Sequence, residues 1–124
     1  MRYMLMIHAD EALEAKMTEE DMGKLMEAYG RFTTEIEEAG VMLGSDRLRP
    51  TSAATCVRVR EGKTLTTDGP FADIKEQFGG FYAIDVPNLD EAIAWAAKIP
   101  TSEIGCVEVR PIWEMEDCPA GDPS

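Results

Sequence analysis

One histidine is the residue of this sequence best suited to acid–base chemistry. His8 is the single histidine, and it follows a short apolar run, Tyr3 to Ile7, that is typical of a buried strand. Because a histidine side chain ordinarily titrates near neutral pH, it often serves as a general acid or base. The competing interpretation of His8 is a partly buried histidine whose ring is satisfied by backbone hydrogen bonds.

Asp68 is the second candidate, and it opens the string Asp-Gly-Pro-Phe at positions 68–71. An aspartate before Gly-Pro can cap its own turn, which explains three of the four residues. The turn does not explain Phe71, and we expect this residue to anchor the loop or to close the wall of a pocket. A carboxylate beside His8 would orient its imidazole ring, so we predict a catalytic pair in which Asp68 orients His8.

Arg47 and Arg49 are candidate substrate-binding residues. They come at the end of an expected strand that stops before Pro50. A guanidinium fork matches the geometry of a carboxylate or phosphate, so either arginine can anchor an anion. Pairing with the acidic residues of this chain is the alternative interpretation.

The sequence contains no pattern that indicates a metal or an organic cofactor. Its three cysteines, Cys56, Cys106 and Cys118, form no CxxC pair, and their odd number argues against a disulfide framework. Cys56 and Cys106 fall in strand-like runs, where we expect them to be small buried residues. Glycine-rich phosphate loops and the HExxH and GxSxG motifs are absent from the sequence. Any chemistry is therefore expected to be independent of cofactors.

The charge of the chain argues against nucleic acid as a partner. It has 24 acidic and 12 basic residues among 124, a net charge of −12, and its densest basic stretch, residues 47–60, is flanked by Asp46 and Glu61. No apolar run approaches the roughly 20 residues that span a membrane. The first residues also lack the pattern of a secretory signal. We expect a cytoplasmic protein without membrane contact.

Two helices are expected to position the candidate residues. The first covers residues 18–39, with Thr18 as its cap and Gly40 as its stop, and carries one apolar stripe. The second begins after Asn88, a capping residue, and ends before Pro100, which forbids continuation.

Six strands complete the expected elements. They are assigned to residues 3–7, 41–49, 55–60, 64–67, 81–86 and 105–112, the third and fourth forming a hairpin. Residues 9–17 are expected to form a loop. Residues 72–78 are expected to form one or two helical turns that the Gly-Gly pair at 79–80 interrupts.

The order of these elements predicts an α+β fold. With the inserted β-hairpin set aside, the remaining order is the ferredoxin-like split βαββαβ. Right-handed crossovers place both helices on one face of an antiparallel sheet, and a second subunit is the simplest cover for the other face. We therefore expect a homodimer. The same topology allows Asp68 to return to the sheet edge at which the strand of His8 ends.

The length and the 44% hydrophobic content of the chain suit a single domain. We assign this domain to residues 1–113. Residues 114–124 are rich in acidic and small residues and are expected to form a flexible tail.

Several segments resemble one family. The string Thr67–Glu76, followed by Gly-Gly-Phe-Tyr at 79–82, resembles the signature of the DGPF-domain branch of the YCII-related family. Residues 2–7 and 107–113 resemble the same branch. The resemblance implies a ferredoxin-like fold that pairs into a dimeric α+β barrel.

The resemblance also implies a histidine–aspartate pair in a cleft. In that family the histidine comes from the first helical region, whereas residues 18–39 of this chain contain none. His8 takes its place as the candidate here, and Asp68 is the candidate aspartate. Similar proteins occur alongside sigma factors, which implies a regulatory role.

Three functions stay open at this point. The first is cofactor-independent acid–base chemistry on a small molecule, with His8 as proton shuttle, Asp68 as orienter, Arg47 or Arg49 as anion anchor and Phe71 as pocket wall. The second is a non-catalytic module that binds a ligand or a protein and is linked to sigma-factor-type transcription regulation. The third is a structural domain in which the Asp-Gly-Pro-Phe string only shapes a turn.

Overall fold

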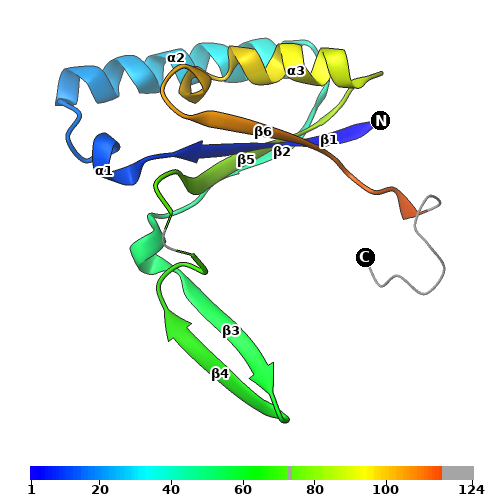
Figure 1. Cartoon of the computed structure of the whole chain (residues 1–124). Coiled ribbons are helices and arrows are strands. Elements are labelled where there is room, and N and C mark those ends of the chain that lie inside the picture. Colours follow the sequence, from blue (N-terminus) through cyan, green and yellow to red (C-terminus); the bar gives the residue numbers. More distant parts are fainter. Residues whose placement is uncertain (73, 116–124) are drawn as a thin grey trace.

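The computed structural model of the chain describes residues 1–72 and 74–115. Four strands form one antiparallel sheet in the order β2-β5-β1-β6, and two long helices cover one of its faces (Figure 1). The strands are β1 (Arg2–Ala9), β2 (Met42–Arg47), β5 (Gln77–Asp85) and β6 (Cys106–Pro111); the helices are α2 (Glu19–Glu38) and α3 (Leu89–Lys98). This order is the ferredoxin-like α+β arrangement that the sequence predicts.

The inserted hairpin forms a second, two-stranded sheet. It consists of β3 (Thr55–Arg60) and β4 (Lys63–Asp68), and it extends away from the body on the side of the main sheet opposite the helices (Figure 1). Glu61 and Gly62 connect the strands, with φ angles of 53° and 76°. Left-handed backbone at two successive turn residues suits the right-handed twist of a hairpin.

The helix ends lie where the sequence places them. The Thr18 hydroxyl accepts a hydrogen bond from the Asp21 amide at 3.1 Å, and the Asn88 side chain accepts one from the Glu91 amide at 3.0 Å. Gly40, with a φ of 71°, follows α2. Each cap satisfies an amide that has no partner within its helix.

The core lies between the two helices and the sheet. Leu5, Ile36, Ile84 and Ile99 are fully buried there. The Phe32 ring of α2 meets Tyr82 edge to face, with centroids 5.1 Å apart. Along β1 the side chains alternate, so Tyr3, Leu5 and Ala9 face the helices whereas Met4, Met6 and His8 face the other side of the sheet.

A short helix replaces part of the loop expected at residues 9–17. It is α1 (Glu11–Glu14), capped by the Asp10 side chain, which accepts a hydrogen bond from the Ala12 amide at 2.9 Å. Four residues make barely one helical turn, so the sequence carries no helical period that would indicate it.

The glycine pair lies inside a strand rather than before one. β5 starts at Gln77 and runs through Gly79 and Gly80, and the described residues of 72–78 form no helix. A Cβ atom added to Gly80 would lie 2.9 Å from the carbonyl oxygen of Asp46 on β2. The missing side chain therefore permits close approach of two strands. In the sequence alone, a glycine pair used in this way is indistinguishable from one that ends an element.

The cysteines differ from the buried residues expected. Cys106 is exposed, and Cys56 is half-buried, with its thiol 3.3 Å from the Gly69 carbonyl oxygen. Both lie on strands whose outer faces carry no second layer. Cys118 lies outside the described residues.

The tail begins with a contact to the first strand. Arg2 donates two hydrogen bonds of 2.8 Å to the carboxylate of Glu114. Residues 116–124 lie outside the described part of the chain. None of the described helices is both long and apolar enough to cross a membrane.

Replacing Gly105 by alanine is expected to destabilise the fold. The new Cβ would overlap the carbonyl oxygen of His8 at the end of β1, and it would also crowd Thr101. We expect the free energy of unfolding in urea to fall by about 1–3 kcal/mol. Gly23→Ala is the control: it lies within α2 with no atom near the new Cβ, and should raise stability by about 1 kcal/mol. Equal stabilities of the two variants would contradict the expectation.

Candidate functional site

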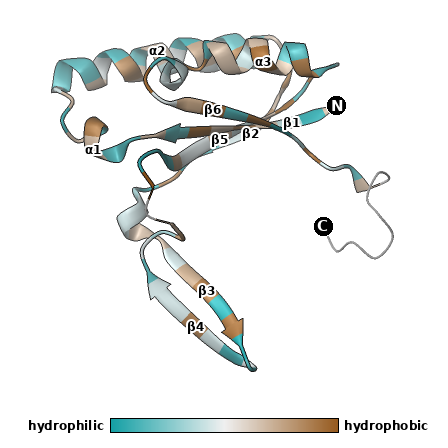
Figure 2. Cartoon of the chain, viewed as in Figure 1, coloured by the Kyte–Doolittle hydropathy of each residue, from teal (hydrophilic) through white to brown (hydrophobic). Residues whose placement is uncertain are grey.

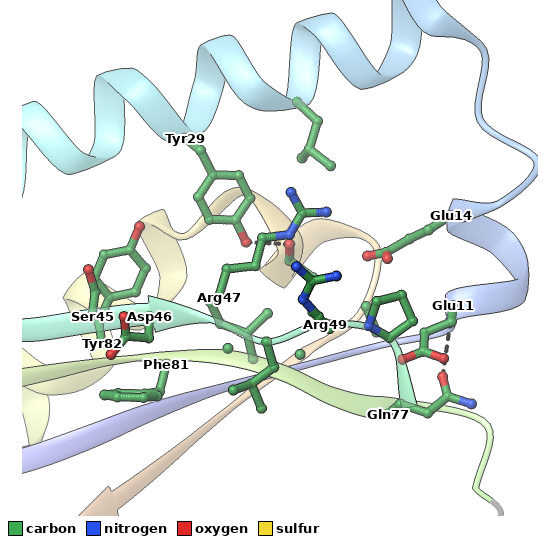
Figure 3. Close-up of a pocket in the computed structure, with 18 residues that line it drawn as sticks. Glu11, Glu14, Tyr29, Ser45, Asp46, Arg47, Arg49, Gln77, Phe81 and Tyr82 are labelled. Carbon is green, nitrogen blue, oxygen red and sulfur yellow. Dashed lines mark hydrogen bonds between the residues drawn. The ribbon is translucent and has the colours of Figure 1, made fainter. Parts of the chain in front are cut away.

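A cavity of about 430 Å³ lies between α2 and the sheet. This volume is within the range of pockets that hold small molecules. β2, β5, α1 and α2 supply most of its walls, and Figure 3 shows the side chains that line it. Its polar and charged lining residues are Glu11, Glu14, Tyr29, Ser45, Asp46, Arg47, Arg49, Gln77, Tyr82 and Thr101.

Strand geometry places both candidate arginines in this cavity. Arg47 lies opposite Gly80 in the register of β2 and β5, so no side chain of β5 fills the space beside it. The Leu48 amide continues the pairing with a 2.8 Å hydrogen bond to the Gly79 carbonyl. Because extended residues alternate in direction, Arg49 returns to the same side as Arg47. Figure 3 shows both guanidinium groups inside the pocket.

Neither guanidinium has an anionic partner in the part of the chain that the structure describes. Within residues 1–72 and 74–115, Arg47 and Arg49 form no ion pair and no side-chain hydrogen bond. Two adjacent cations repel each other, and this repulsion is relieved when an anion binds. Both arginines line the cavity, and their role in substrate binding stays a prediction.

Tyr29 projects from α2 into the same cavity. Its hydroxyl is hydrogen-bonded to the hydroxyl of Thr101, 2.5 Å away, and Thr101 is only 3% exposed. Burial raises the pKa of Tyr29 above its ordinary value, and the hydrogen bond to Thr101 opposes this effect only in part. Tyr29 is therefore a neutral hydrogen-bond donor at physiological pH.

The short helix α1 closes one end of the cavity. The Glu11 carboxylate accepts hydrogen bonds from the amide and the hydroxyl of Thr51, at 2.9 and 2.8 Å. These bonds hold the segment that follows Arg49. Glu14 points into the cavity from the same helix (Figure 3). The pocket thus places a carboxylate across from the arginines.

Of the polar lining residues, sequence reasoning proposed only the two arginines, and it missed Glu11, Glu14, Tyr29 and Thr101 among the others. Tyr29 belongs to the apolar stripe of α2 and resembles an ordinary core residue. The two glutamates lie in a stretch that resembles a loop. A helix of four residues gave no signal by which they could be assigned to a pocket.

His8 lies outside the cavity, on the face of the sheet that has no helices. Its Nε2 atom is 3.2 Å from the Glu108 carboxylate of β6, its ring centroid is 5.6 Å from that of Phe78, and its side chain is 20% exposed. The pKa of Glu108 lies below its ordinary value, chiefly because Arg110 donates a hydrogen bond to it and to a smaller extent because of His8.

Asp68 and Phe71 lie at the base of the hairpin. Asp68 is the exposed last residue of β4 and is paired with Thr55 in the separate two-stranded sheet. The carboxylate beside His8 therefore belongs to Glu108, and the His8–Asp68 pair stays a prediction to which the structure gives no contact. Phe71 is 82% exposed and is not among the residues that line the cavity.

Metal-ligating side chains do not gather in the described part of the chain. No group of three or more histidine, cysteine, aspartate or glutamate residues there could hold an ion.

Comparison with known proteins identifies related sequences along nearly the whole chain. The sequence model of the YCII-related domain matches residues 1–116. An uncharacterized protein of Rhizobium meliloti (strain 1021) is 36% identical over 114 residues, which cover 90% of this chain and 92% of that protein.

The ionisation of Tyr29 provides a test of the cavity. Three tyrosines are present, and we expect the ultraviolet absorbance of tyrosinate to show a component that titrates above the ordinary pKa of about 10. Because the folded state keeps this proton longer than the unfolded state, stability should fall as the pH rises from about 10 through the folded pKa. Tyr29→Phe should remove the late component, whereas Tyr82→Phe should keep it. A late component unchanged in Tyr29→Phe would contradict the burial of this hydroxyl.

Proposed function

The chain belongs to the YCII-related family, and we propose that it is a receptor for a small anionic molecule, a carboxylate or a phosphate ester. The ligand lies in the cavity between α2 and the sheet. The observation that carries this proposal is the pair of guanidinium groups, Arg47 and Arg49, that enter the cavity without an anionic partner.

The composition of the chain strengthens the argument. Because the chain has 24 acidic and only 12 basic residues, each arginine has many carboxylates with which it can pair. Arg47 and Arg49 nevertheless have no ion pair among the described residues. Each guanidinium can donate two parallel hydrogen bonds to two oxygens of one anion, so the pair suits a carboxylate or a phosphate group.

The opposite wall limits the rest of the ligand. Tyr29 offers a neutral hydroxyl, and Glu14 offers a carboxylate that accepts hydrogen bonds and repels negative charge. A ligand with its anionic group at the arginines and a hydroxyl or amine toward Glu14 satisfies both walls.

If the bound molecule reacts by proton transfer, Tyr29 and Glu14 are the donor and the acceptor that the cavity supplies, and His8 is not part of the cavity. The link to a sigma factor stays a prediction.

The uncovered face of the sheet supports the expected homodimer. Met4, Met6, Phe81 and Ala83 lie half-buried on this face, which no helix covers. An apolar face of this kind is stabilised when a second copy covers it, and a two-fold axis lets the same surface serve both copies. We propose that two chains pair through this face.

Anion binding can be measured by thermal denaturation and isothermal titration calorimetry. Inorganic phosphate, sulfate, acetate and a hydroxycarboxylate serve as probes. A probe present at a hundredfold excess over its Kd should stabilise the protein by about 2.7 kcal/mol. Arg47→Gln/Arg49→Gln should weaken binding at least about tenfold, because each lost fork removes a charge-assisted pair of hydrogen bonds.

The control variant removes two positive charges elsewhere. Lys24→Gln/Arg31→Gln changes two exposed residues of α2 that form surface ion pairs with Glu20 and Glu27. This variant should bind the probes as the wild type does. The proposal fails if no probe binds at millimolar concentration, or if the control loses as much affinity as the pocket variant.

A further inference from the structure

Glu14 is a carboxylate of the cavity wall without a partner in the described part of the chain. Its residue is half-buried, and among residues 1–72 and 74–115 it forms no ion pair and no side-chain hydrogen bond. Partial burial of a charge is unfavourable unless an opposite charge or a hydrogen-bond donor compensates it. A cationic group that enters the cavity supplies this compensation.

Hydrogen bonds fix the place of Glu14 relative to the arginines. Its helix, α1, combines hydrophobic and hydrophilic positions (Figure 2). The Glu11 amide donates a 3.0 Å hydrogen bond to the side chain of Gln77, and the Glu11 carboxylate accepts the two hydrogen bonds from Thr51. These bonds fasten α1 to β5 and to the segment that follows Arg49. Because Glu14 lies one helical turn from Glu11, it shares this anchorage.

Charges of opposite sign face the same space without meeting. Figure 3 shows the Glu14 carboxylate and the guanidinium groups of Arg47 and Arg49 directed into the pocket. None of the three forms an ion pair with another, whereas a direct pair would bring nitrogen and oxygen within about 4 Å. The cavity therefore has a positive end and a negative end, with space for a ligand between them.

The charge of Glu14 acts on the hydroxyl groups inside the cavity. Burial is the main cause that raises the pKa of Tyr29, and the Tyr82 hydroxyl and the Glu14 carboxylate add smaller rises. A carboxylate has this effect because it disfavours a second negative charge nearby. The negative end of the cavity thus repels an anion at the place where it attracts a cation.

An ammonium group suits Glu14 better than a hydroxyl group does. A hydroxyl donates one neutral hydrogen bond, whereas an ammonium group carries three donors and a positive charge. Hydrogen bonds between charged groups are roughly twice as strong as neutral ones. The net charge of −12 on the chain favours a cation over a neutral group as well.

We propose that the ligand of this cavity is a zwitterion, with its carboxylate or phosphate at Arg47 and Arg49 and an ammonium group at Glu14. Glu14 is the residue that selects an amine over the corresponding alcohol. This inference rests on the proposed anion receptor and narrows its ligand to amino acids and phosphorylated amines.

Isothermal titration calorimetry of the full chain with matched probes tests the proposal. The pairs are alanine with lactate, γ-aminobutyrate with γ-hydroxybutyrate, and phosphoethanolamine with hydroxyethyl phosphate. Within each pair an ammonium group replaces a hydroxyl group, and the pairs differ in the distance between the charged groups. We expect the amine of at least one pair to bind about tenfold more tightly than its alcohol, because its hydrogen bond to Glu14 is charge-assisted.

Glu14→Gln keeps the size of the side chain and removes its charge. The preferred amine should bind about tenfold more weakly to this variant than to the wild type. Its alcohol should bind at least as tightly as before, because the repulsion of the anionic group is gone. Glu37→Gln is the control: it removes an exposed carboxylate of α2 that does not line the cavity, and should keep the preference for the amine.

The possible failures of the zwitterion and of the anion receptor are distinguishable. Anions that bind without preference for the amine in any pair overturn the zwitterion and leave the anion receptor in place. A preference that persists in Glu14→Gln, or equal strengthening of both members of a pair by that change, overturns the role of Glu14. If no probe of either kind binds at millimolar concentration, the anion receptor fails and the zwitterion fails with it.

Discussion

A glycine at position 80 allows β2 to lie close against β5, and the arrangement of the cavity depends on this contact. Any larger residue would press its Cβ atom against the Asp46 carbonyl and separate the two strands. The pairing sets the register that places Arg47 beside a residue without a side chain. The Leu48–Gly79 hydrogen bond continues this pairing, and Arg49 then lies on the same side as Arg47. The space that the glycine leaves empty becomes part of the pocket, and the two arginines extend over it.

The same region combines groups that would be unfavourable in an ordinary core. Two exposed guanidinium groups, without an ion pair among the described residues, lie near a half-buried phenol and a carboxylate, in a chain that is otherwise strongly acidic. Two adjacent like charges repel each other in the free protein. Sites that recognise ligands commonly retain this kind of local conflict, which binding then relieves.

The distribution of the two helices explains the remaining features. Both cover the same face of the sheet, so the face that carries His8 and Glu108 has no second layer among residues 1–72 and 74–115. The hairpin projects from that side and also lacks a supporting layer. The surfaces that lack cover in one copy are therefore adjacent.

Local signals in the sequence determined the limits of the two long helices and the order of the main elements. Thr18 and Asn88 cap helices through atoms three residues away, and the alternation of apolar residues indicates the strand Thr55–Arg60 within a few positions, although its valines are exposed in the single chain. The order of these elements already specifies the ferredoxin-like topology. These features follow from the sequence because each depends on neighbouring residues.

Tertiary structure alone decided which side chains meet. His8 contacts Glu108 across 100 positions, and Tyr29 contacts Thr101 across 72. The first pair depends on the register of β1 and β6, in which a shift of one residue would move the side chain to the other face. The second depends on the packing of α2 against the segment that follows α3. The sequence indicated the two arginines because their chemistry is visible in isolation. It did not indicate that a glycine pair would form part of a strand, since close approach is a property of two segments and not of one.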